Sequence, residues 1–184
     1  MKAYTKIGGV RIFGAPVFVH WSVGVVALGL LVASGEHPAL AIVGISSYFG
    51  VLLLHESGHA YFAKRQGSTP LSIKLSAVHG TCTEPYGAYE DYLIAWGGVI
   101  AQLAVAVPLV VLNATLGLGN IDPIGPVVGI LGYVSIAIAA FNLIPAAGLD
   151  GARAWRLIPL LFNKRRANQF RPSRKKRGKL RILK

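Results

Sequence analysis

Cysteine and charged side chains are scarce in this sequence. Its 184 residues include one cysteine, Cys82, which excludes an intrachain disulfide and a zinc site made of four cysteines. Only 14% of the residues are charged, whereas about 25% is usual in a soluble domain. Because 53% of the residues are hydrophobic, the composition indicates a membrane protein.

Lysine and arginine are absent from two long stretches, residues 12–63 and 75–152. Hydropathy gives four apolar runs: Val17–Ser34, Ala39–Phe62, Tyr92–Leu116 and Pro126–Ala147. Each run approaches or exceeds the roughly 20 residues that a helix needs to cross the hydrocarbon core of a bilayer. The sequence therefore predicts an all-α polytopic membrane protein with about four to six transmembrane helices.

The basic residues lie in three blocks, residues 2–11, 64–74 and 153–184. When the apolar runs cross the membrane alternately, all three blocks fall on the same side. Lysine and arginine are retained in the cytoplasm, so we expect both termini and the segment 64–91 to be cytoplasmic.

The last basic block predicts a separate tail. We divide the chain into a membrane domain, residues 1–163, and a basic cytoplasmic tail, residues 164–184, which we expect to be disordered. Each basic residue near anionic lipid contributes about 1 kcal/mol to membrane binding, so the bilayer surface is the predicted partner of the tail. Nucleic acid is the less favoured partner, because no aromatic interleaving and no known nucleic-acid motif accompanies the charge.

Between the second and third apolar runs, residues 71–75 alternate apolar and polar side chains, which is the period of a half-buried strand. His79-Gly80 is a turn signal, and residues 81–83 again favour a strand. We therefore predict a small β-hairpin on the cytoplasmic side over residues 71–83. Such a hairpin would offer an exposed edge to an extended peptide.

The second apolar run contains the motif His55-Glu56-Ser57-Gly58-His59. A helix turns by about 100° per residue, so histidines at i and i+4 project from one face and can close on one Zn²⁺ ion. The glutamate between them is placed to take a proton from the attacking water. Ionisable side chains are costly at membrane depth, so their presence in this run indicates a function.

Asp150 is the candidate for a third ligand, because catalytic zinc takes three protein ligands and leaves a fourth position open. It follows the fourth apolar run, and no basic residue stands close before it in the sequence. A lone carboxylate in that place needs a partner or a metal. Alternate threading puts this end of the run on the same side as the histidines, so we expect His55, His59 and Asp150 to meet at similar depth.

Two motifs together resemble those of the site-2 protease family, the zinc-dependent intramembrane metalloproteases. They are the histidine motif and Asn142-Leu143-Ile144-Pro145 followed by Leu149-Asp150-Gly151. Weaker support comes from Gly14–Trp21 and from Ala95–Gln102, where Val99 stands at a position that is usually proline. The resemblance covers roughly residues 8–160.

The resemblance implies a role for each matching residue. His55, His59 and Asp150 would bind one Zn²⁺, Glu56 would be the general base, and Asn142 would help to position the substrate or to stabilise the oxyanion. The family implies endoproteolysis of transmembrane protein substrates, in the cell membrane of a prokaryote. The length leads us to expect a minimal form without a PDZ or CBS domain.

Two other classes of function fit the same residues. A catalytically silent scaffold or chaperone would keep the fold and bind client proteins, although loss of the base is then expected and Glu56 is intact. A small ion transporter would line an ion path with these polar groups, and the spacing of the histidines would be a coincidence. Zinc content and proteolysis of a Glu56→Gln variant separate the three hypotheses.

Overall fold

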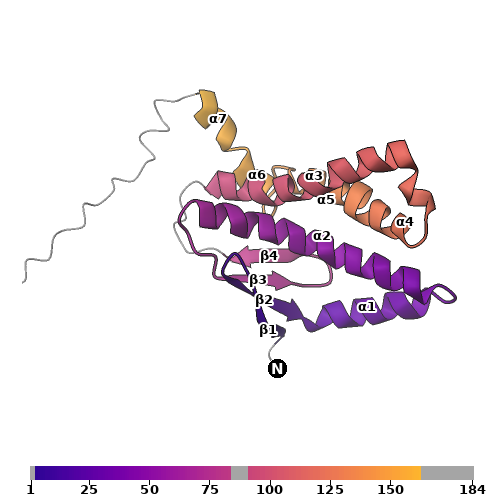
Figure 1. Ribbon diagram of the computed structural model, residues 1–184. Helices are drawn as coiled ribbons and strands as arrows, with labels where there is room; N and C mark the ends of the chain where they lie inside the picture. Colours follow the sequence, from indigo (N-terminus) through magenta and orange to yellow (C-terminus); the bar gives the residue numbers. More distant parts are fainter. Residues whose placement is uncertain (1–2, 84–90, 163–184) are drawn as a thin grey trace, which may run out of the picture.

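The structure, a computed structural model, describes residues 3–83 and 91–162. The predicted tail, residues 164–184, lies outside these residues. The main elements in chain order are β1 (Tyr4–Ile12), β2 (Ala15–His20), α1 (Trp21–Ala33), α2 (Pro38–Arg65), β3 (Ser72–Leu75), β4 (Gly80–Thr83), α3 (Asp91–Leu116), α4 (Ile124–Val127), α5 (Ser135–Asn142), α6 (Gly151–Ala154) and α7 (Leu157–Phe162). Figure 1 shows three layers, with α2 between the sheet on one side and α3 and α5 on the other.

The central helix α2 has a clear sequence signal at each end. Pro38 stands in its first turn, where the missing N–H leaves no hydrogen bond unmade. Lys64 and Arg65 occupy its last turn, where positive charge favours the negative end of the helix dipole. Gly67, at a φ of 79°, turns the chain away towards the sheet.

Within the described residues, three helices are long and apolar enough to cross a membrane: Pro38–Arg65, Tyr92–Leu116 and Ile124–Asn142. The last of these joins α4, a π-helical segment over Val128–Val134, and α5. They match three of the four predicted spans, and the chain is an integral membrane protein.

The first predicted span differs from the structure. Its opening residues, Val17 to His20, belong to β2, and only the 13 residues of α1 are helical. At 1.5 Å per residue α1 is about 20 Å long, which is less than the ~30 Å of the hydrocarbon core. Hydropathy missed the strand because Val17-Phe18-Val19 is as apolar as a buried helix.

A four-stranded sheet in the order β1-β2-β3-β4 replaces the isolated hairpin that we predicted, so the fold is not all-α. The predicted hairpin itself is confirmed: β3 and β4 pair antiparallel. The unpredicted half is a second hairpin, β1 and β2, whose turn holds Phe13 and Gly14 at positive φ. Strand β2 then runs parallel to β3, which leaves β4 at one edge of the sheet.

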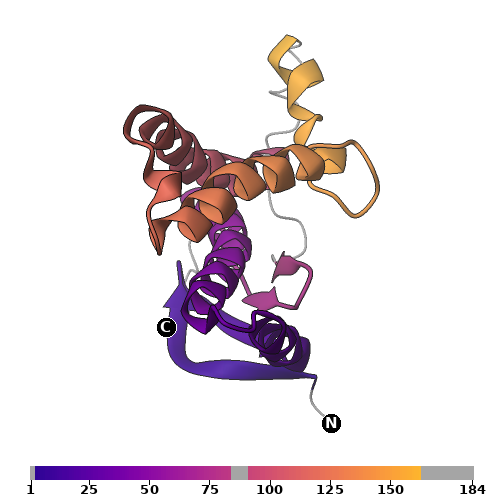
Figure 2. The ribbon, with the colours of Figure 1, turned by 90° about the vertical axis from the view of Figure 1, so that its right-hand side faces the viewer.

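The inner face of the sheet packs on α2 through a small apolar core. This core consists of Ala15, Val17, Leu52, Ala60, Ile73 and Leu75. The view along the layers shows α2 enclosed between the sheet and the α3–α5 layer (Figure 2). The part of α2 that faces the sheet is therefore shielded from its surroundings on two sides. The histidine motif lies in this part of α2.

Candidate metal centre

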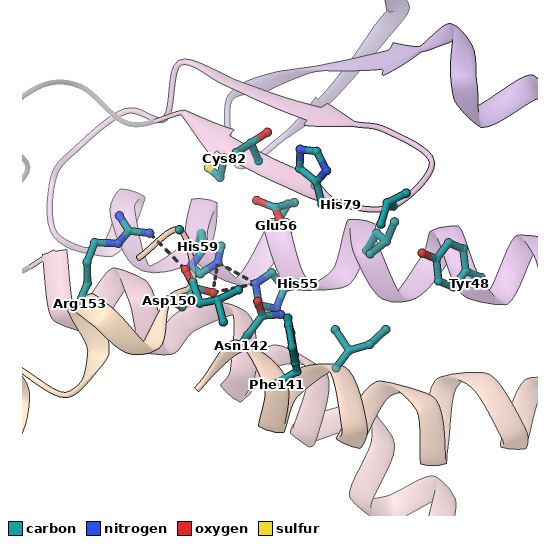
Figure 3. Close-up of a pocket in the computed structure, with 17 residues that line it drawn as sticks. Tyr48, His55, Glu56, His59, His79, Cys82, Phe141, Asn142, Asp150 and Arg153 are labelled. Carbon is teal, nitrogen blue, oxygen red and sulfur yellow. Dashed lines mark hydrogen bonds and ion pairs between the residues drawn. The ribbon is translucent and has the colours of Figure 1, made fainter. Parts of the chain in front are cut away.

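The histidine motif occupies the buried, C-terminal half of α2. His55, Glu56 and His59 are each no more than 6% exposed. The imidazoles of His55 and His59 turn towards the α3–α5 layer, whereas Glu56 turns towards β4 (Figure 3). Helix α2 therefore presents the two imidazoles on one face and the carboxylate of Glu56 on a neighbouring face.

Small residues bring α3 against α2 at the level of the motif. A Cβ atom on Gly58 would collide with the carbonyl of Gly97, and one on Gly97 would lie 2.6 Å from the carbonyl oxygen of Gly58. A Cβ atom on Gly98 would lie 2.5 Å from the ring of His55. Close approach of two membrane helices through small residues is common, and here it leaves room for the imidazole between them.

The outer nitrogen of each imidazole has an acceptor on α3. His59 Nδ1 lies 2.7 Å from the carbonyl oxygen of Ile94, and His55 Nδ1 lies 2.8 Å from Oε1 of Gln102. A carbonyl oxygen only accepts hydrogen bonds, so His59 Nδ1 must carry the proton. This tautomer leaves Nε2 with a free lone pair, as a metal ligand requires.

Asp150 reaches the histidines from the loop that follows α5. Trp155 Nε1 donates to the carbonyl of Leu143 at 2.6 Å, and Trp96 Nε1 donates to the carbonyl of Ala154 at 3.0 Å. The two indoles pack edge to face, with ring centroids 5.6 Å apart. These contacts fix both ends of the segment that carries Asp150 to its neighbours.

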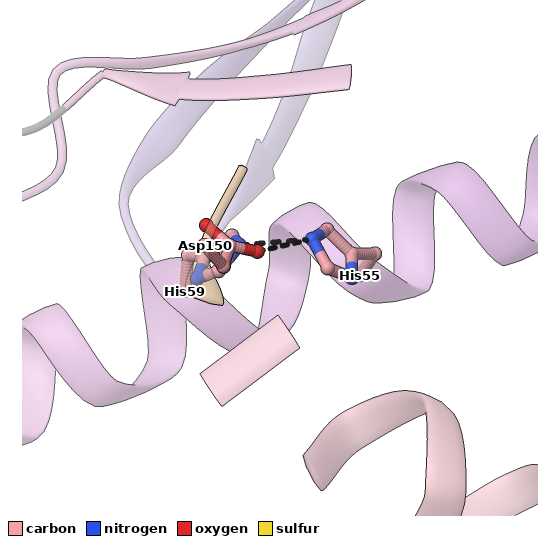
Figure 4. Close-up of side chains that lie close together, drawn as sticks. All are labelled: His55, His59 and Asp150. Atoms are coloured by element: carbon pink, nitrogen blue, oxygen red, sulfur yellow. Dashed lines mark hydrogen bonds and ion pairs between the residues drawn. The ribbon is translucent and has the colours of Figure 1, made fainter. Parts of the chain in front are cut away.

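The three predicted ligands meet at one point (Figure 4). Asp150 Oδ2 lies 2.9 Å from His55 Nε2 and 3.1 Å from His59 Nε2, and the two Nε2 atoms are 3.0 Å apart. In a tetrahedral zinc site with bonds of about 2.0–2.1 Å, ligand atoms stand about 3.3 Å apart. An outward shift of a few tenths of an ångström therefore fits these residues to zinc.

Arg153 holds the other oxygen of the Asp150 carboxylate. Its guanidinium lies 3.2 Å from Oδ1, so Oδ2 alone faces the histidines. Burial opposes ionisation of Asp150, but hydrogen bonds from Nε2 of His55 and His59 outweigh it and hold the pKa of the carboxyl below its ordinary value. The group is therefore ionised at neutral pH, the state in which a carboxylate binds a metal. A bound metal ion would displace these Nε2 protons and leave the Nδ1 protons in place.

A cavity of about 650 Å³ opens beside these residues. Its polar lining includes His55, Glu56, His59, Asn142 and Asp150, together with Arg153. Its apolar lining includes Tyr48, Leu52, Ile138, Phe141 and Leu149. All five predicted site residues thus border one space, with the ligand cluster on one wall.

Sequence reasoning did not assign a role to Gln102, Arg153 or the two tryptophans. The available signals were weak: a single amide in an apolar run, and a basic residue three positions after Asp150. Which backbone carbonyl receives each indole N–H depends on tertiary packing alone.

Several known proteins resemble this chain. In a comparison with models of protein families, none matches. Rip3 of Mycobacterium tuberculosis, whose name describes it as a candidate zinc metalloprotease, is 32% identical in an alignment of 166 positions that covers 79% of this chain and 42% of Rip3. The zinc metalloprotease MJ0392 of Methanocaldococcus jannaschii is 29% identical over 80% of this chain and 44% of its own.

The fold matches a solved structure, the site-2 protease from Methanocaldococcus jannaschii, with a TM-score of 0.64 and 24% identity over 86% of this chain and 72% of that chain. Fold and site define a membrane protein with a buried His-His-Asp cluster whose geometry fits one metal ion. The chain therefore has the fold of a site-2 protease, and its relatives in sequence are named zinc metalloproteases. It spans less than half the length of the curated relatives that it matches.

Proposed function

We propose that this chain is a zinc-dependent endopeptidase that hydrolyses peptide bonds within or near transmembrane segments of other membrane proteins. The observation that carries this proposal is the convergence of His55, His59 and Asp150. Their ligand atoms all lie within 4.8 Å of one another, between apolar helices of membrane length. The relatives are named as zinc metalloproteases, which supports zinc as the ion.

Each residue of the site has a distinct task in this reaction. Zinc held by the three ligands would polarise the scissile carbonyl and make water a stronger nucleophile. Glu56 takes a proton from the attacking water and returns it to the leaving amine. Asn142 borders the same cavity, and its side-chain N–H groups are suited to stabilise the oxyanion of the tetrahedral intermediate.

The substrate segment must be extended, because a helix shields its peptide bonds with its own hydrogen bonds. The predicted hairpin is suited to hold such a segment, and the sheet leaves β4 as its edge on the cavity side. Ser76 N–H donates to the carbonyl of His79, so in this antiparallel pair the backbone groups of Gly80 and Cys82 point away from β3. The Cys82 N–H donates to the Glu56 carboxylate, so a strand that pairs along β4 would lie beside Glu56. We propose that the substrate adds to the sheet along β4.

Cys82 gives a direct test of this mode of binding, since it is the single cysteine and lies on that edge. A Glu56→Gln variant is mixed with single-span substrates that carry one cysteine at successive positions, and disulfide formation is induced. Strand addition predicts crosslinking at every second position, because side chains in a strand alternate between faces. A period near 3.6, or crosslinking that persists in Cys82→Ser, contradicts it.

The main test of the function is cleavage of a panel of tagged single-span proteins in detergent, with and without a zinc chelator. We expect cleavage that the chelator abolishes, and a Glu56→Gln variant that keeps zinc but does not cleave. A scaffold would bind the panel without cleaving it. A transporter would show ion flux that depends on these residues and no proteolysis.

We propose further that the active site is reached from the cytoplasm. In Figure 1 the loops before α2 and after α3 lie at one end of the molecule, and the motif lies towards the other. The basic residues Lys64, Arg65 and Arg153 belong to the second end, which supports a cytoplasmic location for it. Anionic lipid at that surface is the proposed partner of the tail.

A further inference from the structure

Gln102 is a polar side chain in an unfavourable place. It is completely buried within α3, a helix of high mean hydropathy that is long enough to cross the membrane. Its Nε2 has no hydrogen-bond partner among the described residues. A buried amide with an unpaired donor destabilises a fold, so a compensating role is expected for its other atom, Oε1.

That oxygen faces the metal centre. It lies 2.8 Å from Nδ1 of His55, on the side of the ring opposite to Asp150. Ile94, Gly98 and Gln102 follow one another at intervals of four residues, so they lie on one face of α3. The carbonyl of Ile94 receives the hydrogen bond of His59. Gly98 leaves space for the ring of His55, and Gln102 receives the hydrogen bond of that ring.

The orientation of the amide decides which nitrogen of His55 carries the proton. With Oε1 towards the ring, Nδ1 must donate and Nε2 keeps its lone pair for the metal. If the amide were reversed, Nδ1 would accept and the proton would sit on Nε2, where it would block metal binding. His59 is fixed by a backbone carbonyl, whereas His55 depends on this one side chain.

We propose that Gln102 is a positioning residue, which fixes the tautomer and ring orientation of His55 so that Nε2 binds zinc. The inference rests on the zinc centre of the proposed function and adds a residue that acts through His55. A second consequence comes from the chemistry of the acceptor. A neutral amide raises the basicity of the imidazole less than a carboxylate would, so the zinc ion keeps more of its Lewis acidity.

The test measures zinc binding, so it does not depend on a substrate. Full-length wild type and variants are purified in detergent, and their zinc affinity is measured by competition with a chelating dye. Gln102→Met keeps the length of the side chain but removes the acceptor, and Gln102→Glu restores an acceptor. Val99→Ala is the matched control: it loosens the packing of a buried position on the same helix and leaves Gln102 intact.

We expect Gln102→Met to bind zinc about 10- to 100-fold more weakly, which is the usual loss when such a supporting partner is removed. Gln102→Glu should recover most of that affinity, and Val99→Ala should bind as wild type does. The visible absorption of bound Co²⁺ should change in Gln102→Met, since the angle of one ligand ring changes, and should stay as in wild type in Val99→Ala.

Wild-type affinity in a folded Gln102→Met variant overturns the inference. If that variant does not fold, a folded Gln102→Glu variant decides, because loss of zinc despite a restored acceptor also overturns it. The same loss in Val99→Ala would mean that packing alone matters. Failure of the wild type to bind zinc would instead overturn the proposed function.

Discussion

At the scale of single residues, every predicted zinc ligand is held by a second group. His59 has a backbone carbonyl, His55 has Gln102, and Asp150 has Arg153. These partners differ in how strongly they hold the ligands. The first two are buried between helices, whereas the Arg153 side chain is 39% exposed, so solvent weakens its hold on Asp150.

Arg153 should therefore matter less than Gln102. In Arg153→Met, Asp150 loses the partner that keeps Oδ1 away from the histidines, and we expect zinc affinity to fall by less than about 10-fold. Arg156→Met, which removes the same charge from a nearby position, is the control and should bind zinc as wild type does. Competition with a chelator measures the zinc affinity of both variants. An equal loss of zinc affinity in the two would mean that net charge, and not the contact with Asp150, is responsible.

In the proposed reaction Asn142 acts in a different step from the zinc ligands, so its variant should change a different measured quantity. Asn142→Ala should bind zinc normally, because no ligand depends on it, while kcat falls by about 100-fold as for the loss of one oxyanion donor. Single-substrate kinetics with zinc quantification check this. A raised KM with unchanged kcat would assign Asn142 to substrate binding instead.

At the scale of elements, the contact between α2 and α3 controls the metal centre. The helices approach at Gly58 and Gly97, and the ring of His55 lies against Gly98. The predicted spans identified both helices, but this contact depends on the azimuth of each helix, which hydropathy does not report.

Gly98→Ala tests that contact. The new methyl group would lie 2.5 Å from the imidazole of His55, so the ring must move and zinc binding should be lost or strongly weakened. Gly50→Ala on α2, where an added Cβ meets nothing within 4 Å, should keep wild-type zinc and be equally or more stable. Zinc content and thermal unfolding of the two variants are compared; normal zinc in Gly98→Ala would contradict this packing of the two helices.

At the scale of the whole molecule, the charge distribution predicts orientation in the membrane. In a Cys82→Ser background, a cysteine at Thr69 should react with a membrane-impermeant maleimide only after cells are opened, because residues 64–74 carry a basic block. A cysteine at Glu36, in the loop at the other end, should react in intact cells. The reverse pattern would place the active site on the outer side.

The sequence predicted the parts of the fold that depend on local pattern. Three spans, the hairpin at 71–83 and the meeting of His55, His59 and Asp150 follow from hydropathy, alternation and charge. The strand at Val17 was missed because a short apolar, β-branched run fits a strand and a helix equally well. Gln102 was missed because its partner lies on another helix, 47 residues away in sequence.

The π-helical segment Val128–Val134 has a consequence for the reaction site downstream of it. A π turn arises when one extra residue is accommodated in a helix, and each added residue of an α-helix rotates the downstream part of the helix by about 100°. Because the wide turn absorbs the extra residue, the helix beyond it keeps the orientation of an uninterrupted α-helix, and Asn142 borders the cavity. A residue inserted within α5 would not be absorbed in this way, and it would turn Asn142 round the axis, away from the cavity.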